Sequence, residues 1–577
     1  MRTNASTLAR IAVAGTLDWT DRRVVRSGRA ALREAAATVR GEPAVSTGAA
    51  WGLILVVRLF LGGAVGLADN FDGHRLLCQL GVAPHPFAAS QPLWAYATPR
   101  YDAYTWYGEA CSAGGTGQPY LSTEYFPLWL AKLLTHLYGL PGALDLRMLG
   151  LVFAVGVAVA VGWTVRELPG PTWARVLIAS GIGLAAVDSA IAPYYISPFS
   201  EPAALLGLLL LIPALLRLLS RERLRGGDLA LVAAITAWTI GAKTQMAALL
   251  PVVVVLMLLR PCVRPSSRLN LPGAARPLRA LARRVPALLV CVGLVGATAE
   301  FEVHQSRWLN EIVLYNNVFD SVLGHSSDVP GDLRALHLPA NFAPAAGAPV
   351  TSPQSAAALP DYPQFLRHAS FAGVVEFYAT HPDRLFGVFD RGLVGMSATR
   401  PPYLGNYQAS SGAAPYAQEC RVCVAAAAFT LAEPFRWMVI PGIWLLALIG
   451  GIRLARRRDL PIRAQGVGAV LAALSAATVV QFWTVMLTEG DSDVEKHLVF
   501  ALFGTMLLGP LGAAALAAAD TRRPAAAGVG SGAAATVVAT PRTAPDSVPD
   551  LVSGLAPDPT PNLRPNLTLS QIPESVR

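Results

Sequence analysis

Apolar runs of roughly membrane-spanning length follow one another along the chain, separated by polar segments. A hydrocarbon core of about 30 Å needs about 20 apolar residues in a helix. The runs are 50–67, 145–165, 172–191, 201–218, 229–243, 246–259, 285–301, 434–452, 465–487 and 497–518. This pattern predicts about ten transmembrane helices, and an all-α polytopic membrane protein as the fold class.

The stretch 229–259 is the least regular of these runs, because the letters "GAKTQ" (241–245) divide it. Read as a single helix it would hold about 31 residues, which is more than a core of about 30 Å accommodates at 1.5 Å per residue. We therefore predict two helices here.

Arginines gather in three of the connecting segments, 217–228, 260–284 and 453–463. Positive charge in short connections favours the cytoplasmic side, and ten helices with a cytoplasmic N-terminus bring all three segments there. One helix fewer would place 453–463 outside. The segments expected outside are 192–200, 241–245, 488–496, a large extracytoplasmic first loop at 68–144 and a second extracytoplasmic segment at 302–433.

The expected organisation has three parts. Residues 1–48 are arginine-rich without an early apolar core, which predicts a basic cytoplasmic segment rather than a cleaved signal peptide. Residues 49–519 form the transmembrane domain with its two extracytoplasmic segments. Residues 520–577 are rich in Ala, Pro, Thr, Ser and Gly, which predicts a disordered cytoplasmic tail. We expect a multi-pass protein of the plasma membrane with both termini in the cytoplasm.

The composition agrees with a polytopic membrane protein and narrows the kinds of partner that we expect. Hydrophobic residues make up 53% of the chain and charged residues 14%, a balance that a soluble domain cannot bury. The net charge of +9 comes from arginines in the connections between apolar runs. We therefore expect the lipid bilayer, and no nucleic acid, as a partner.

Four of the six cysteines fall in the two large outside segments, where disulfides are allowed. Cys78 and Cys111 lie in the first, and we predict that they form a disulfide. Cys420 and Cys423 lie in the second. They could be a tight disulfide, a redox pair or two free thiols, whereas two cysteines alone do not favour a metal site.

The first outside segment opens with "ADNFDGHRLL" (68–77), which places Asp69, Asp72 and Arg75 just after an apolar run. A carboxylate at the membrane surface can act as a general base, or can bind a cation that holds a phosphate. Arg75 lies three residues after Asp72 and could hold Asp72 or a phosphate. The alternative is a solvated helix end with capping acids.

Three other outside segments carry candidate groups. Glu201 precedes Pro202 at a helix entrance, where an acid also suits the helix dipole. Lys243 lies between two apolar runs and could bind a lipid phosphate, pair with an acid, or snorkel to the surface. The segment 488–497 holds Lys496, His497 and an Asp-x-Asp at 491–493, which a hydrophilic turn would explain equally well.

The large segment 302–433 interleaves arginines with aromatics and prolines at "HPDRLFGVFDRG" (381–392) and "RPPYLGNY" (400–407). Arginine and tyrosine suit contacts to sugars and phosphates, and Arg400 is the candidate from this region. An amphipathic helix followed by a turn-rich loop is the alternative interpretation.

Taken together, these features resemble the GT-C glycosyltransferases, and more narrowly a family of bacterial hexose transferases assigned to cell-surface and cell-wall glycan synthesis. The resemblance spans about residues 50–505 and rests on an ordered set of stretches. They are "NFDGHR" (70–75), "YYISPFSEP" (194–202), "GAKTQ" (241–245), 315–347, 381–392 with 400–407, and "EKHLVFALF" (495–503).

The resemblance implies a polyprenyl-phosphate-linked sugar donor and a cell-envelope glycan or lipid acceptor. It implies that Asp72 is the base or orients the acceptor, with Asp69 as the alternative. Substrate-binding positions implied on the matching stretches are Arg75, Glu201, Lys243, Gln245, Arg400, Lys496 and His497. Some enzymes of this class have adjacent acids or Asp-x-Asp. The Asp-x-x-Asp found here favours a single working acid and leaves a divalent cation open as a cofactor.

A non-enzymatic role competes with this interpretation: a transporter of lipid-linked glycans, or a cell-envelope assembly protein. A transporter should carry polar groups near the bilayer midplane on broken helices. The candidates for such groups are few, Arg58 within the first run and Asp188 near the end of the third. Asp69 or Asp72 facing Lys243 and Glu201 across a cleft would favour the enzyme.

Overall fold

The structure is a computed structural model of the chain, which divides into two compact units, Met1–Pro524 and Ala525–Arg577. All the residues that the structure describes belong to the first unit. They are 41–520 without 69, 71, 85–93, 104–119, 263–282 and 351.

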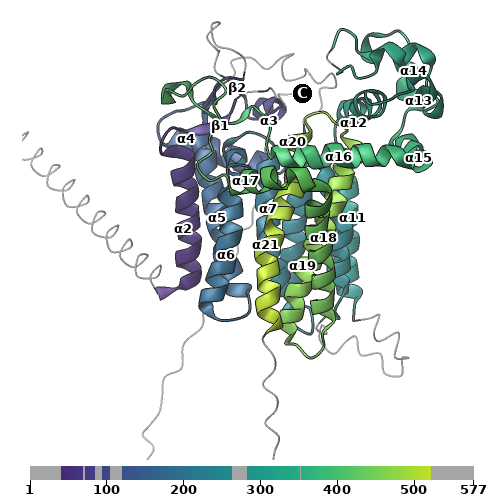
Figure 1. Ribbon diagram of the computed structural model, residues 1–577. Coiled ribbons are helices and arrows are strands. Elements are labelled where there is room, and N and C mark those ends of the chain that lie inside the picture. Colours follow the sequence, from purple (N-terminus) through teal and green to yellow (C-terminus); the bar gives the residue numbers. More distant parts are fainter. Residues whose placement is uncertain are drawn as a thin grey trace, which may run out of the picture. The chain divides into compact units, whose positions relative to one another are not determined.

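Long apolar helices dominate the described part of the chain (Figure 1). Seven candidate membrane spans are α2 (Pro43–Phe60), α5 (Leu146–Glu167), α7 (Glu201–Leu219), α11 (Val285–Val303), Val424–Arg456, α19 (Ile462–Thr488) and α21 (Val499–Ala519). The span Val424–Arg456 comprises α17 (Val424–Ala432), η8 (Glu433–Phe435) and α18 (Arg436–Arg456). Three shorter apolar helices are α6 (Thr172–Val187), α8 (Gly226–Ile240) and Thr244–Leu258. The predicted all-α polytopic membrane fold is confirmed.

The division of the stretch 229–259 into two helices is also confirmed. After α8 the chain turns at 241–243 and continues as η2 (Thr244–Leu249) and α9 (Leu250–Leu258). Before α8, Leu224 donates its backbone N–H to the carbonyl of Pro261, which follows α9, at 2.9 Å. The two helices therefore form a hairpin whose tip, at Lys243, lies at the opposite end from Leu224.

The first helix differs from the predicted run at both ends, since α2 spans Pro43–Phe60 instead of 50–67. Pro43 suits the first helical position, where no N–H is needed. Gly62 and Gly63 adopt φ values of 76° and 96°, a left-handed backbone that ends the helix. The apolar residues that follow pair as strand β1 (Val65–Leu67) with β5 (Leu404–Tyr407).

Short elements gather at one end of the long helices (Figure 1). Within 68–144 and the connections they are α3 (His74–Gln79), α4 (Tyr125–Leu137), η1 (Ala192–Ile196), α20 (Val494–His497) and an antiparallel sheet of β2 (Val82–Pro84), β3 (Arg100–Ala103) and β4 (Leu144–Asp145). Within 302–433 they are α12 (Arg307–Tyr315), η4 (Asn316–Leu323), α13 (Val329–Ala335), η5 (Ala340–Ala345), η6 (Ala356–Ala358), α14 (Tyr362–His368), α15 (Phe371–Thr380), α16 (Pro382–Ala398) and η7 (Ala409–Ser411).

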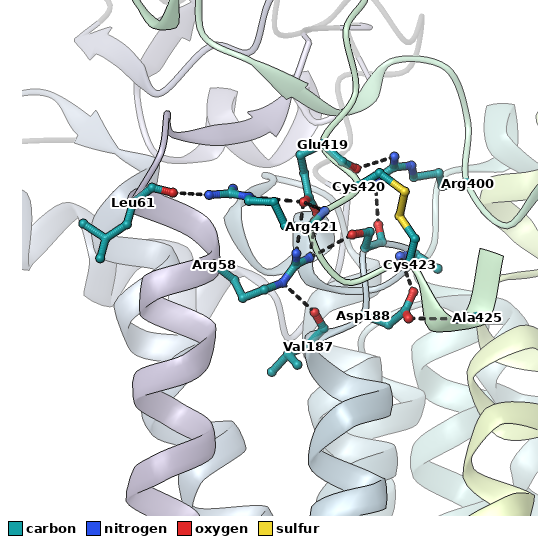
Figure 2. A network of polar contacts seen from close by, with 12 residues as sticks. Arg58, Leu61, Val187, Asp188, Arg400, Glu419, Cys420, Arg421, Cys423 and Ala425 are labelled. Carbon is teal, nitrogen blue, oxygen red and sulfur yellow. Dashed lines mark hydrogen bonds and ion pairs between the residues drawn. A yellow bond between two sulfur atoms is a disulfide. The ribbon is translucent and has the colours of Figure 1, made fainter. Parts of the chain in front are cut away.

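A buried ion pair fastens the large segment 302–433 to the helices (Figure 2). Arg58 of α2 is 5% exposed, and its Nη1 and Nη2 donate to the two carboxylate oxygens of Glu419 at 3.0 and 2.7 Å. Its Nε donates to the carbonyl of Val187, and Nη2 also donates to the hydroxyl of Ser189. All of these hydrogen bonds lie in the interior, where a bidentate pair is strong.

A disulfide and a further hydrogen bond also hold the chain around Glu419 in place (Figure 2). Cys420 and Cys423 form a disulfide immediately after it. The carboxylate of Asp188, at the end of α6, accepts the backbone N–H of Ala425 at 2.9 Å. Arg58 and Asp188 are thus engaged in holding the segment in place.

Candidate active site

A cavity of about 860 Å³ lies at the end of the helices where the short elements gather. Its walls come from segments far apart in the chain: the start of 68–144, the entrance of α7, the hairpin tip, the end of α11 and the connection between α19 and α21. The polar residues that these segments contribute are Asn70, Asp72, Arg75, Ser200, Glu201, Lys243, Thr244, Gln245, Glu302, Gln305, Glu489, Ser492, Asp493, Lys496 and His497.

Lys496 joins two carboxylates on one side of this cavity. Its Nζ contacts Oδ2 of Asp72 and lies 2.8 Å from Oδ2 of Asp493, while the ammonium stands 5.3 Å from the centre of the Phe199 ring. The hydroxyl of Tyr403 donates to the same Asp493 oxygen. Lys496 is 5% exposed, so its charge is held by these two acids rather than by water.

Asp72 is the accessible member of this group, with a side chain that is 42% exposed. Desolvation in the cavity wall raises the pKa of its carboxyl, but the ammonium of Lys496 outweighs that effect and lowers the pKa to about 2. Arg75 and Lys243 add to the lowering. Asp72 is therefore an ionised carboxylate, and a weak base for as long as Lys496 stays in contact with it.

A second buried pair forms another part of the wall. Nζ of Lys243 lies 2.6 Å from Oε1 of Glu201 and 3.1 Å from Nδ1 of His497. An ammonium can only donate, so Nδ1 accepts and the proton of the imidazole is on Nε2. Burial lowers the pKa of His497 well below its usual range, and the two lysines lower it further, so the ring is neutral.

The sequence did not indicate a role for Glu124, whose side chain contacts the start of α7. Its side chain is fully buried, and Oε2 accepts the backbone N–H of Ala203 in the first turn of α7 at 2.7 Å. Burial raises the pKa of this carboxyl well above its usual range. Glu124 thus caps the helix that carries Glu201, although a lone acid in "YLSTEYFP" gave no signal of that role.

Arg75 lies against two aromatic rings, a contact that the sequence also did not indicate. Its guanidinium carbon stands 4.8 Å from the centre of the Trp308 ring and 6.0 Å from that of Tyr120. A cation–π contact of this kind helps to hold an arginine in place while its N–H groups can still bind an anion.

The Asp-x-Asp of the 488–497 segment does not act as one unit. Asp491 lies 2.8 Å from Nε of Arg391 and 2.9 Å from Nε2 of His325, whereas Asp493 faces Lys496 and Tyr403. Among the residues described by the structure, no group of three or more His, Cys, Asp or Glu side chains could hold a metal ion.

The expected residues meet in this cavity with two exceptions. Asp72, Arg75, Glu201, Lys243, Gln245, Lys496 and His497 all line it. Asp69 lies outside the described residues. Arg400 does not line the cavity, because its guanidinium donates to the carbonyls of Ser189 and Glu419, at 2.8 and 2.6 Å, in the network of Figure 2.

Of the cysteine alternatives, the tight disulfide between Cys420 and Cys423 is the one found. Cys78 is also disulfide-bonded, while Cys111 lies outside the described residues. We expect peptide mapping without reduction to yield a fragment that joins Cys78 to Cys111 and separates on reduction. Free Cys111, alkylated before reduction, would contradict the predicted pairing.

Comparisons with known proteins place the chain in a family. The family described as YfdI N-terminal transmembrane domain matches residues 42–524, which include the ten apolar helices found in the described part of the chain and every described residue of the cavity. Neither the curated proteins nor the solved structures gave a significant match. The chain therefore belongs to the YfdI N-terminal transmembrane domain family.

Proposed function

We propose that this protein is a GT-C-type glycosyltransferase, which moves a hexose from a polyprenyl-phosphate carrier to a cell-surface glycan or lipid acceptor. The observation that carries this proposal is the meeting of Asp72, Glu201 and Lys243 in one cavity of about 860 Å³. An accessible carboxylate beside buried cations is the combination needed to accept a proton and to stabilise a phosphate leaving group.

The placement of charge supports the extracytoplasmic face as the site of reaction. The chain near Leu224 and Cys262, which adjoins the arginine-rich segments, lies at the end of the helices opposite the cavity. If those segments face the cytoplasm, as positive charge favours, then the cavity opens on the other side. The donor would hold its lipid chain in the bilayer and present its phosphate at the membrane surface.

The alternative role as a transporter has less support. Arg58 and Asp188, the polar residues within the spans that suggested it, bind the segment around Glu419 (Figure 2). The charged groups of the cavity lie at the ends of the long helices or in the connections beyond them. Examples are Glu201, Lys243 and Lys496. This arrangement suits chemistry on a lipid held at the surface.

In the proposed reaction an acceptor hydroxyl attacks C1 of the hexose. The new bond joins the acceptor oxygen to C1, and the bond between C1 and the phosphate oxygen breaks with its electron pair leaving on the phosphate. The hydroxyl proton passes to Asp72, and polyprenyl phosphate is released. Direct displacement inverts the configuration at C1, and a β-linked phosphate would give an α-linked product.

Lys496 links donor binding to the strength of the base. Its ammonium is shared by Asp72 and Asp493. A donor phosphate brings new negative charge and competes for that ammonium, which weakens its hold on Asp72 and raises the pKa of the carboxyl. Asp72 then becomes a better base only when a donor is present. Lys243 and Arg75 provide further positive charge for the phosphate.

This role predicts a specific pH effect for Lys496→Met. Lys496 lowers the pKa of Asp72 to about 2, so Asp72 stays ionised between about pH 7 and pH 4. Protonation of this base should therefore not lower kcat/KM of the wild type in that range. Without the ammonium the pKa rises, so kcat/KM of the variant should fall as the pH drops through that range, and KM for the donor should increase. Lys132→Met, outside the cavity, is the control. Identical profiles for the two variants would contradict this role.

The proposed function is tested with purified protein reconstituted in lipid. It is given a panel of polyprenyl-phosphate-hexoses and an extracted cell-envelope acceptor, and hexose transfer is followed. We expect transfer from at least one donor. Movement of an intact lipid-linked sugar across the bilayer, without transfer from any donor, would favour the transporter instead.

A further inference from the structure

α11 packs against α8 and α9, and the wall that these elements contribute to the cavity contains buried acceptor oxygens that have no hydrogen-bond partner in the protein. They are Oε1 of Gln245, Oε1 of Glu302 and Oε1 of Gln305. Gln245 and Gln305 are 5% and 3% exposed. Gln245 belongs to the hairpin tip, whereas Glu302 and Gln305 lie at the end of α11 and just beyond it.

The orientation of the two amides is fixed by their other contacts. Nε2 of Gln305 donates to the carbonyl of Leu121 at 2.9 Å, and Nε2 of Gln245 donates to the carbonyl of His497 at 3.2 Å. A carbonyl cannot donate, so a flipped amide would set two acceptors against each other. The free groups of Gln245 and Gln305 are therefore their oxygens.

A buried acceptor without a partner costs free energy, and native proteins leave few of them. Three unpartnered acceptor oxygens in one wall favour a ligand that supplies hydrogen-bond donors. An ionised phosphate has only acceptor oxygens and would be repelled here, whereas sugar hydroxyls can each donate a hydrogen bond. Gln245 is bonded to the backbone of His497, whose ring contacts Lys243, so this wall adjoins the cations expected to meet the phosphate.

We propose that Gln245, Glu302 and Gln305 form the subsite for the hexose hydroxyls of the donor. The inference rests on the proposed function and adds where the sugar lies: its hydroxyls face these three oxygens, while the phosphate faces Lys243 and Lys496. A site that hydrogen-bonds hydroxyl groups discriminates strongly against analogues that lack them. These residues therefore determine which sugars are accepted.

The test compares the affinity of reconstituted protein for polyprenyl phosphate with its affinity for polyprenyl-phosphate-hexose. Glu302→Leu removes one acceptor, whereas Glu302→Gln keeps a carbonyl oxygen in its place. Glu300→Leu is the matched control, because Glu300 lies on the same helix, is 75% exposed and does not line the cavity. Gln305→Leu serves as a second, independent variant.

We expect Glu302→Leu and Gln305→Leu to weaken binding of the hexose lipid about tenfold and to leave polyprenyl phosphate binding unchanged. Glu302→Gln and Glu300→Leu should stay within about threefold of the wild type. Equal losses for both lipids, or no loss for either, would overturn the subsite. Stabilisation by Ca²⁺ alone that disappears in Glu302→Leu would overturn it too, by assigning the wall to a cation.

Failure of the proposed function is detected separately, because hexose transfer is followed in the same reconstituted protein. If that function is wrong, the wild type transfers no hexose from any donor, even if it binds both polyprenyl lipids as a transporter would. If the wild type transfers hexose and the variants show no selective loss of hexose-lipid binding, the subsite alone is wrong.

Discussion

Asp72→Asn is expected to reduce hexose transfer by about 10²–10⁴-fold, the range that general base catalysis supplies. The amide has nearly the same shape as the carboxylate but cannot accept the proton of the acceptor hydroxyl. Asp72 is 42% exposed, so its replacement should leave the protein folded. The rate is measured with saturating donor in reconstituted protein, and donor affinity should change much less than the rate.

Asp383→Asn is the matched control for this prediction. Asp383 lies in the first turn of α16, is 78% exposed and is not among the residues that line the cavity. The same substitution there should leave transfer unchanged. A rate for Asp72→Asn within a few fold of the wild type would exclude Asp72 as the base.

Glu419→Gln is expected to lower the free energy of unfolding by about 3–5 kcal/mol, because it leaves the charge of Arg58 buried without its partner. The pair is almost completely buried, with side chains that are 5% and 0% exposed. The loss should appear as a lower thermal midpoint in detergent micelles. Since the pair holds the segment 302–433 to α2, transfer should fall along with stability.

The pair of Arg166 with Glu42 provides the control for this second prediction. Its shortest N···O distance is also 2.7 Å, but the two side chains are 59% and 56% exposed, so Arg166→Met should cost about 1 kcal/mol or less. Replacing Arg58 and Glu419 together by apolar residues should recover much of the loss. A Glu419→Gln variant as stable as Arg166→Met would contradict the role given to the buried pair.

The helical part of the fold could be predicted from the sequence because apolar runs and their charged connections are local signals. Run length and arginine placement were enough to divide 229–259 into two helices, as the hairpin confirms. The first helix was misplaced at both ends. Ser46 and Thr47 interrupt the apolar pattern although they lie inside α2, and the apolar residues 64–67 continue that pattern although they lie beyond the helix.

The site was predictable only in part, since its contacts join distant positions. Asp72 and Lys496 are 424 residues apart, and nothing in either stretch shows that they meet. Arg400 was expected near the phosphate because arginine binds anions well, yet its guanidinium donates to two backbone carbonyls instead. Glu302 and Gln305 follow an apolar run without any motif, and only their unpartnered oxygens distinguish them.

The measurement that tests the proposed function most directly is the stoichiometry of product formation. Reconstituted protein is supplied with a polyprenyl-phosphate-hexose and an envelope acceptor, and both products are quantified by mass spectrometry. We predict that each hexose gained by the acceptor is matched by one polyprenyl phosphate released, and that both products are lost in Asp72→Asn. Release of polyprenyl phosphate without a glycosylated acceptor, or no release from any donor in the panel, would contradict a glycosyltransferase.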